Sequence, residues 1–328
     1  MRVVLEIPAS YQIAIMPGSA TGAVEAALWN FLGSRGVDVF SWDVFGKLWV
    51  MDVVQQLKIP EQRIFEAVNF GEIPDLSQYN PNHDVVFTWN GTSAGVCVPN
   101  LDWIPDVRQG LTICDATSSA FALPLVWEKL DITAFSWQKG LGSEAAHGMV
   151  ILSPRAIEQL QQYTPSWPIP RLFRLTKDKK LIDGIFIGKT INTPSMLCTE
   201  DCLAALCWAQ AIGGQKALTA RTLANFKVLD KWLEHHSCLE YLARERASLS
   251  PVSVCFKLKD SQVPASKQAT IIQKVCQRLA ESGVAFEIKN HAVAPPSFRV
   301  WCGPTVEKED LKRLVPWIDW ALSTVLKT

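Results

Sequence analysis

The first half of the chain alternates short apolar runs with stretches of helical periodicity. Runs that favour buried strands lie at residues 11–17, 37–42, 63–68, 84–91, 111–119, 130–140 and 147–154. Amphipathic helical patterns lie between them at 21–33 and 48–57, and another begins near Pro154. Short buried strands that alternate with helices are typical of parallel sheets covered on both faces. The pattern therefore predicts an α/β fold with a mostly parallel sheet flanked by helices.

The second half of the chain departs from this alternation. Residues 163–195 are rich in proline and basic side chains and show little periodicity, so we expect a long excursion with a functional or interface role. Helical patterns resume at 202–214 and 218–236. The end of the chain predicts a strand at 252–258, a helix at 265–283, strands at 284–289 and 298–303, and a helix at 308–326. We therefore expect a large domain at 1–245 and a small α+β domain at 246–328.

Composition narrows the classes of partner. Among 328 residues, 32 basic and 32 acidic side chains balance, which gives no electrostatic reason to expect nucleic acid or an acidic membrane surface. The start of the chain has no signal-peptide pattern, and no apolar stretch reaches the length of a membrane span. Nine scattered cysteines without a C-x-x-C pair indicate free thiols and no zinc site. We expect a cytoplasmic protein that acts on small molecules.

Three polar features follow predicted strands, at the ends where ligands bind in open α/β sheets. The first strand runs into a turn from Gly18 to Gly22 that opens a helix, and its backbone N–H groups can hold a phosphate. Asp115 ends an apolar run, and Lys139 leaves the next one in a glycine-bearing turn. Each feature alone also fits a structural role: an ordinary glycine turn, a turn-capping aspartate or a surface lysine.

Together, a phosphate cradle, an aspartate and a lysine match the needs of pyridoxal phosphate. The lysine forms a Schiff base with the cofactor aldehyde, and the aspartate keeps the pyridine nitrogen protonated, which makes the ring an electron sink. Trp49, near the start of the second predicted helix, can cover the ring face. Because the chain has 13 tryptophans, the residues alone favour a plain core position for Trp49. By spacing alone, the cofactor site and the structural roles both stay open.

Long stretches of the chain resemble the phosphoserine aminotransferases of many proteobacteria and some archaea. They include "CDATSSAFALPLVWEKLDITAFSWQKG" and "GKTINTPSMLCTEDCLAAL" and cover residues 18–39, 84–118, 114–156, 188–206 and 299–311. These enzymes are class V, fold-type I aminotransferases, so the resemblance implies pyridoxal 5′-phosphate as cofactor and no metal. It also implies transfer of the glutamate amino group to 3-phosphohydroxypyruvate, which gives 3-phosphoserine and 2-oxoglutarate in serine biosynthesis.

The resemblance assigns roles to matching positions of this sequence. It implies that Lys139 is the Schiff-base lysine and shuttles a proton between the substrate Cα and the cofactor C4′. Asp115 would pair with the pyridine nitrogen, Trp49 would stack on the ring, and Thr92 would bond the ring hydroxyl. Three further residues would bind the cofactor phosphate from the same subunit, namely Ala20, Thr21 and Gln138.

Other implied roles concern a second subunit and the substrate. Asn192 and Thr193 would reach the cofactor phosphate of the partner subunit, which implies a homodimer with shared active sites and makes the excursion an intersubunit arm. Arg299 matches the small-domain arginine that grips the substrate α-carboxylate, a task that suits a bidentate guanidinium. His147 fits a structural histidine better than a catalytic base.

The sequence also departs from the family pattern. Family members normally begin with a further segment, whose glycine-rich start and His-Arg pair help bind the substrate phosphate, whereas this chain starts after it. We expect either that the start of the reading frame was assigned too far downstream or that part of the phosphate pocket is truly lost. The family also usually has an acidic residue where Ala20 stands. Two alternatives therefore stay open: an aminotransferase for an unphosphorylated 2-oxo acid such as hydroxypyruvate or glyoxylate, or a truncated, weakly active cofactor-binding dimer.

Overall fold

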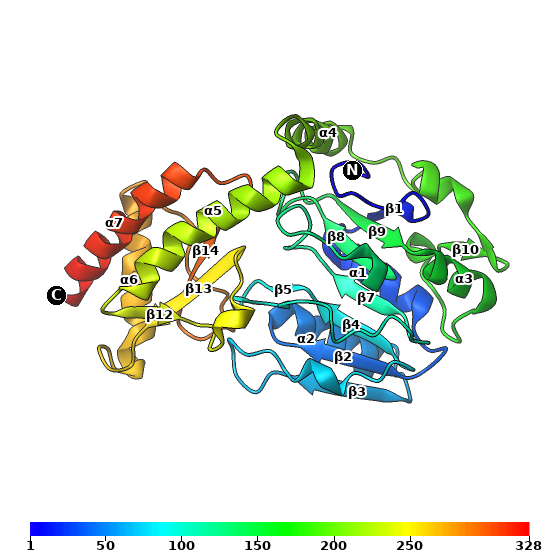
Figure 1. Cartoon of the computed structure of the whole chain (residues 1–328), viewed down its shortest axis with the longest axis horizontal. Coiled ribbons are helices and arrows are strands. Elements are labelled where there is room, and N and C mark those ends of the chain that lie inside the picture. The colour runs from blue at the N-terminus through cyan, green and yellow to red at the C-terminus, as the bar shows by residue number, and fades with distance from the viewer. Residues whose placement is uncertain (328) are drawn as a thin grey trace.

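A seven-stranded sheet forms the centre of the large unit. The computed structural model describes residues 1–327, and its large and small units lie side by side (Figure 1). The strand order is β1-β9-β8-β7-β4-β2-β3, and only β1 and β9 pair antiparallel with their neighbours. This confirms the predicted mostly parallel sheet. Its strands are β1 (Gln12–Pro17), β2 (Val37–Ser41), β3 (Gln62–Glu66), β4 (Asp84–Thr88), β7 (Thr112–Asp115), β8 (Ile132–Ser136) and β9 (His147–Leu152).

Both faces of this sheet are buried, as the apolar runs predict. Successive residues of one strand enter different cores: Val39 and Val86 pack in one, and Phe40 and Phe87 in the other. Helix α1 (Ser19–Phe31) lies against β8 and β9 through small residues. Helix α2 (Val44–Met51) continues into a π-helical turn at Asp52–Gln56, and α3 (Pro154–Gln162) completes the layer.

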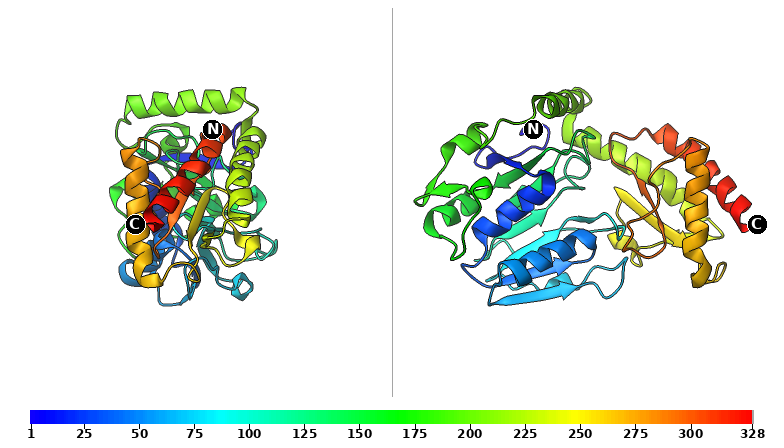
Figure 2. Two further views of the ribbon diagram at one scale, coloured as in Figure 1. Left: turned by 90° about the vertical axis from the view of Figure 1, so that its left-hand side faces the viewer. Right: turned by 180° about the vertical axis from the view of Figure 1, so that it is seen from behind.

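The excursion that follows α3 contains only short elements. They are η4 (Arg171–Phe173), β10 (Thr176–Lys177), β11 (Lys180–Leu181) and η5 (Asp183–Ile187). Helix α4 (Met196–Ala211) then begins earlier than predicted, because the Ser195 hydroxyl caps it by accepting a hydrogen bond from Cys198 N at 3.4 Å. Helix α5 (Gly214–Glu234) runs from the large unit to the small one (Figures 1 and 2).

The small unit is an antiparallel sheet with helices, as the predicted α+β pattern indicates. Strands β12 (Leu239–Tyr241), β13 (Ser253–Leu258) and β14 (Phe298–Trp301) pair in that order and pack against α6 (Ala265–Glu281) and α7 (Lys308–Leu326). Since β12 belongs to this sheet, the sheet starts before the expected domain boundary at residue 246. The boundary itself stays a prediction.

The expected strand at 284–289 is wrong. The segment meets the sheet only at its end, where Lys289 forms an isolated bridge to Phe298 and Ile288 O accepts a hydrogen bond from Arg299 N at 2.7 Å. Glu287 has φ 55°, in the left-handed region, which interrupts an extended backbone. Phe286 is 68% exposed, so the apolar alternation that favoured a strand does not correspond to a buried face.

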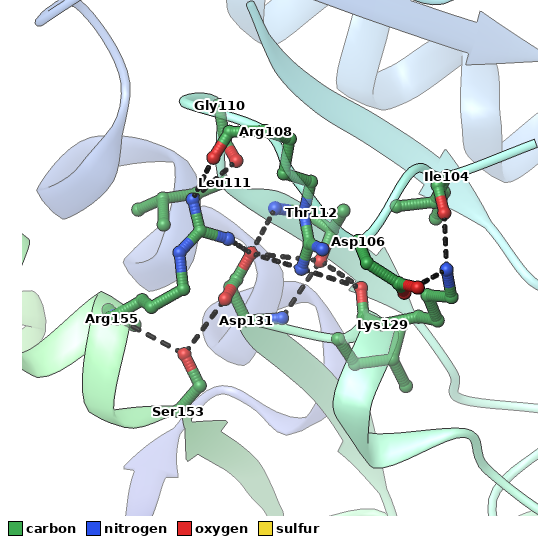
Figure 3. Close-up of polar contacts among 12 residues, drawn as sticks. Ile104, Asp106, Arg108, Gly110, Leu111, Thr112, Lys129, Asp131, Ser153 and Arg155 are labelled. Atoms are coloured by element: carbon green, nitrogen blue, oxygen red, sulfur yellow. Dashed lines mark hydrogen bonds and ion pairs between the residues drawn. The ribbon is translucent and has the colours of Figure 1, made fainter. Parts of the chain in front are cut away.

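A buried carboxylate, Asp131, fixes the amino ends of β7 and β8 (Figure 3). Lys139 follows the opposite, carboxyl end of β8. Asp131 Oδ2 accepts hydrogen bonds from Arg108 Nη2 at 3.1 Å, Arg155 Nη1 at 2.8 Å and Thr112 N at 3.0 Å. Its Oδ1 accepts one from the Ser153 hydroxyl, the N-cap of α3, at 3.0 Å. The Asp131 and Arg108 side chains are both 3% exposed, so the ion pair between them is shielded from solvent, whereas Arg155 is 39% exposed; together they tie two strands and a helix.

Asp131→Ala is expected to destabilise the large unit by about 3–5 kcal/mol, because it leaves the Arg108 guanidinium as a buried, unpaired charge. Urea unfolding followed by tryptophan fluorescence measures the effect as a fall in the transition midpoint. Asp106→Ala is the matched control: it removes an 88% exposed partner of Lys129 and should leave the midpoint near that of the wild type. Equal losses in the two variants would contradict this interpretation.

Candidate active site

A cavity of about 160 Å³ lies where the carboxyl ends of β4, β7 and β8 meet the N-terminus of α1. This is the sheet edge at which the sequence predicts a site. Seven of the predicted residues line it, and they come from five separate parts of the chain. The lining residues are Ser19, Ala20, Thr21, Phe45, Trp49, Thr88, Asn90, Thr92, Asp115, Thr117, Ser118, Gln138 and Lys139.

Lys139 leaves β8 in a turn and places its amine in this cavity. Burial lowers the pKa of Lys139 below its usual range, the positive charge of Arg299 lowers it further, and the Asp115 carboxylate partly offsets both. The amine forms no hydrogen bond or ion pair within residues 1–327. A lysine in these surroundings is biased toward the neutral, nucleophilic amine.

Asp115, at the end of β7, is held in place by three donors. Its Oδ1 accepts hydrogen bonds from Thr117 N at 3.0 Å and the Thr117 hydroxyl at 2.6 Å, and its Oδ2 accepts one from Trp49 Nε1 at 3.1 Å. Burial raises the pKa of Asp115, and these hydrogen bonds partly offset the rise. The carboxylate is therefore fixed in direction, and one lone pair of Oδ2 is left for a cationic N–H donor in the cavity.

The N-terminus of α1 forms the polar end of the cavity. Gly18 and Ser19 have φ values of 83° and 58°, so the chain turns sharply and directs backbone N–H groups at the cavity, and the first turn carries no acidic residue. Gly148 of β9 permits this close approach, because a Cβ there would lie 2.2 Å from Ser19 O. Gln138 Oε1 and Thr88 Oγ1 are buried without a hydrogen-bond partner. The backbone N–H groups suit this end of the cavity to an anion with several acceptor oxygens, whereas Gln138 Oε1, itself an acceptor, needs a separate donor.

Thr92 of the large unit lines the cavity, whereas Arg299 of the small unit lies outside its lining but near enough for its charge to act on Lys139. The Thr92 hydroxyl lines the cavity and donates to Ser118 Oγ at 2.9 Å. Arg299 lies on β14, opposite Cys255 of β13, and its positive charge lowers the pKa of Lys139. Its guanidinium has no carboxylate partner within residues 1–327, which is unusual for a half-buried arginine and fits a side chain that binds an anionic ligand.

Comparison with known proteins decides the family. The chain is 48% identical to the phosphoserine aminotransferase of Methanosarcina mazei over 324 residues, which cover 99% of this chain and 85% of that protein. The chain belongs to the phosphoserine aminotransferase family. No family model matches it.

Solved structures of the family have the same fold. The phosphoserine aminotransferase from Cytophaga hutchinsonii, 18% identical, superposes with a TM-score of 0.80 over 97% of this chain and 85% of that one. The PLP-bound phosphoserine aminotransferase from Trichomonas vaginalis, 19% identical, gives a TM-score of 0.79 over 97% and 85%. At this identity the likeness shows the fold alone, and it agrees with the fold-type I architecture expected from the sequence.

Two predicted cofactor residues of this family member lie away from the cavity. Asn192 and Thr193 are exposed, and neither lines the cavity in its own chain. Their reach into a partner subunit stays a prediction. His147 is also outside the lining: its Nε2 accepts a hydrogen bond from Ser195 N at 3.2 Å and its ring contacts Trp137, which fits the expected structural role.

The sequence analysis assigned no site role to several of the lining residues. Thr117 and Ser118 lie in "DATSS", directly after a strand end, so their position was a usable signal. Asn90 likewise follows β4. Phe45 gave no signal, because its place in the first turn of α2 depends on Asp43, whose Oδ1 caps that helix by accepting from Phe45 N and Gly46 N.

The chain carries no sign of a metal site or a membrane span in the part that the structure describes. No group of three or more histidine, cysteine, aspartate or glutamate side chains in residues 1–327 is placed to hold a metal ion. Among the same residues, no helix combines the length and apolar character needed to cross a bilayer.

Proposed function

We propose that this protein is a pyridoxal-phosphate-dependent phosphoserine aminotransferase. It transfers the amino group of glutamate to 3-phosphohydroxypyruvate and forms 3-phosphoserine and 2-oxoglutarate. The observation that carries the proposal is the cavity in which Lys139, Asp115 and the α1 N-terminus meet, in a chain 48% identical to a phosphoserine aminotransferase.

The donor set of the cavity fits pyridoxal phosphate. The α1 N-terminus, with Ala20 and Thr21, would hold the phosphate, and the unpaired Gln138 Oε1 beside it would accept from a neighbouring N–H or water. Asp115 Oδ2 would hold a proton on the pyridine nitrogen, Trp49 would border the ring, and Thr92 would bond the ring hydroxyl. When bound, the cofactor supplies an electron sink for the carbanion at the substrate Cα.

Lys139 has two tasks in this proposal. Its amine, biased toward the neutral form by burial and by Arg299, would hold the cofactor through its aldehyde. When free, the same amine would be the base that takes the proton from the substrate Cα and the acid that returns it at the cofactor C4′. Arg299 binds the α-carboxylate of either substrate through its unpaired guanidinium and so fixes which Cα–H bond faces Lys139.

A homodimer with shared sites is part of the proposal. Helix α4 lies at the edge of the molecule in every view (Figures 1 and 2), and only Cys202 and Ala209 of it are buried. Met196, Leu197 and Leu203 on it are 62%, 77% and 51% exposed, and large apolar side chains gathered on one exposed element are typical of a protein–protein contact surface. A second copy that covers α4 would also bring a neighbouring Asn192 and Thr193 toward the cavity.

We also place the protein in the cytoplasm. All nine cysteines are free, and five of them are buried, which suits a reducing compartment. Serine biosynthesis from small, charged metabolites is consistent with that location.

Separated half-reactions test the proposal. Cofactor-loaded protein is treated with glutamate, freed of it by gel filtration, and then given 3-phosphohydroxypyruvate, hydroxypyruvate or glyoxylate in separate reactions. We expect rapid formation of 3-phosphoserine and much slower transfer to the two unphosphorylated acids. Faster transfer to hydroxypyruvate or glyoxylate would overturn the substrate assignment in favour of an unphosphorylated 2-oxo acid. No transfer to any acceptor would indicate a weakly active cofactor-binding protein.

A further inference from the structure

A buried hydrogen-bond chain begins at the wall of the cavity. Ser118 Oγ accepts from Asn90 Nδ2 at 3.0 Å and from the Thr92 hydroxyl at 2.9 Å, and it donates to Asn90 O at 3.1 Å. This uses both lone pairs and the proton of the Ser118 hydroxyl. Asn90, Thr92 and Ser118 are at most 5% exposed, so these bonds do not compete with bulk water.

The same hydrogen-bond chain continues to the start of the small-unit sheet. Asn90 Oδ1 accepts a hydrogen bond from the Ser250 hydroxyl at 2.6 Å. Ser250 Oγ in turn accepts from Val252 N at 3.2 Å and Ser253 N at 2.9 Å, so its proton is committed to Asn90. The amide of Asn90 therefore has one consistent orientation, with its oxygen toward Ser250 and its nitrogen toward Ser118.

The hydrogen-bond chain ends on β13, the strand that pairs with the strand of Arg299. Ser253 is the first residue of β13, and its hydroxyl also donates to Thr92 O at 2.8 Å. Two residues along β13, Cys255 pairs with Arg299 of β14. The position of Arg299 relative to Lys139 thus depends on how β13 is fastened to the cavity wall.

We propose that Asn90 and Ser250 are positioning residues that fix Arg299 at the right distance from Lys139 for a substrate carboxylate. This inference rests on the proposed role of Arg299. Neither residue needs to touch the substrate α-carboxylate, since both act through β13. The Asn90–Ser250 bond can be removed without separating the two units, because other contacts also join them. Asn290 Nδ2 donates to Ser93 O at 2.8 Å, and Ser250 N donates to Gly95 O at 2.9 Å.

Ser250→Ala tests the proposal, because it removes the hydroxyl that donates to Asn90 and accepts from Val252 N and Ser253 N at the start of β13. The contacts of Asn290 with Ser93 O and of Ser250 N with Gly95 O stay in place. We expect about a tenfold rise in the KM for glutamate and in the dissociation constant of a non-reactive dicarboxylate, measured by calorimetry on cofactor-loaded protein. The affinity of the apo-protein for pyridoxal phosphate, followed by tryptophan fluorescence, should stay unchanged. Ser248→Ala is the matched control, since this buried hydroxyl donates only within its own turn, to Glu245 O at 3.0 Å.

A merely structural role gives a different result. Ser250→Ala would then lower the melting temperature while the dicarboxylate bound as tightly as in Ser248→Ala, and this outcome would overturn the inference. Should Ser250→Ala fail to fold, Ser253→Ala cuts the parallel bond to Thr92 O and carries the same test.

Arg299→Lys, measured in parallel, distinguishes a failure of the positioning inference from a failure of the proposed role of Arg299. Weak dicarboxylate binding in Arg299→Lys with normal binding in Ser250→Ala rejects the positioning role and keeps the proposed function. Normal binding in Arg299→Lys rejects the role of Arg299 and the positioning inference together.

Discussion

Lys139→Ala is expected to lower transaminase activity by about 10⁴-fold, the upper end of what a positioned proton-transfer group supplies. The variant loses both the amine that binds the cofactor covalently and the base that moves the proton at the substrate Cα. The cofactor phosphate end of the cavity is untouched, so pyridoxal phosphate should still bind, but without the visible absorption of its covalent link to lysine. Steady-state assays and absorption spectra of the purified variant measure both effects.

Lys47→Ala is the control for this experiment. Lys47 is exposed on α2, close in sequence to Trp49, and has no place in the cavity, so its removal should change neither activity nor spectrum. Wild-type activity in Lys139→Ala would show that the amine of another residue does the chemistry.

Asp115→Asn is expected to lower kcat by at least about 100-fold, because a neutral amide cannot hold the proton on the pyridine nitrogen. The change also removes the charge that raises the pKa of Lys139, so this pKa should fall further. In apo-protein the rate of cofactor capture rises as Lys139 loses its proton, so the rise should move to lower pH in the variant. Stopped-flow capture rates across pH measure the shift.

Asp102→Asn, at an exposed position outside the cavity, is the matched control for a lost carboxylate. The pH profile separates an electrostatic role from a structural one. An unchanged kcat in Asp115→Asn would contradict the assignment of this carboxylate to the ring nitrogen, and a profile that moved to higher pH would contradict its effect on Lys139.

The sheet could be predicted from the sequence because its strands are buried on both faces. Runs such as those around Val86 and Ile113 are apolar at successive positions, which is a strong local signal. Strand ends then located Asp115 and Lys139, since the carboxyl ends of parallel strands share one edge. The first strand and the helix after it located the α1 N-terminus by the same reasoning.

Other features depend on contacts between residues far apart in the chain, and the sequence pattern does not reveal them. The segment at 284–289 alternates like a strand, but Glu287 adopts a left-handed backbone and Phe286 faces solvent. Ser250 has the composition of an ordinary turn residue, and only the fold brings it to Asn90, 160 positions earlier. The role of Arg299 came from the resemblance, because an arginine on an edge strand is by itself ordinary.

Reduction of the cofactor-loaded protein with borohydride, followed by peptide mapping, tests the central claim most directly. Hydride addition makes the bond between lysine and cofactor permanent, so the labelled residue can be identified by mass spectrometry. We predict a single pyridoxyl label, at Lys139, which glutamate treatment before reduction abolishes. A label on another lysine, or none at all, would contradict the account of this site.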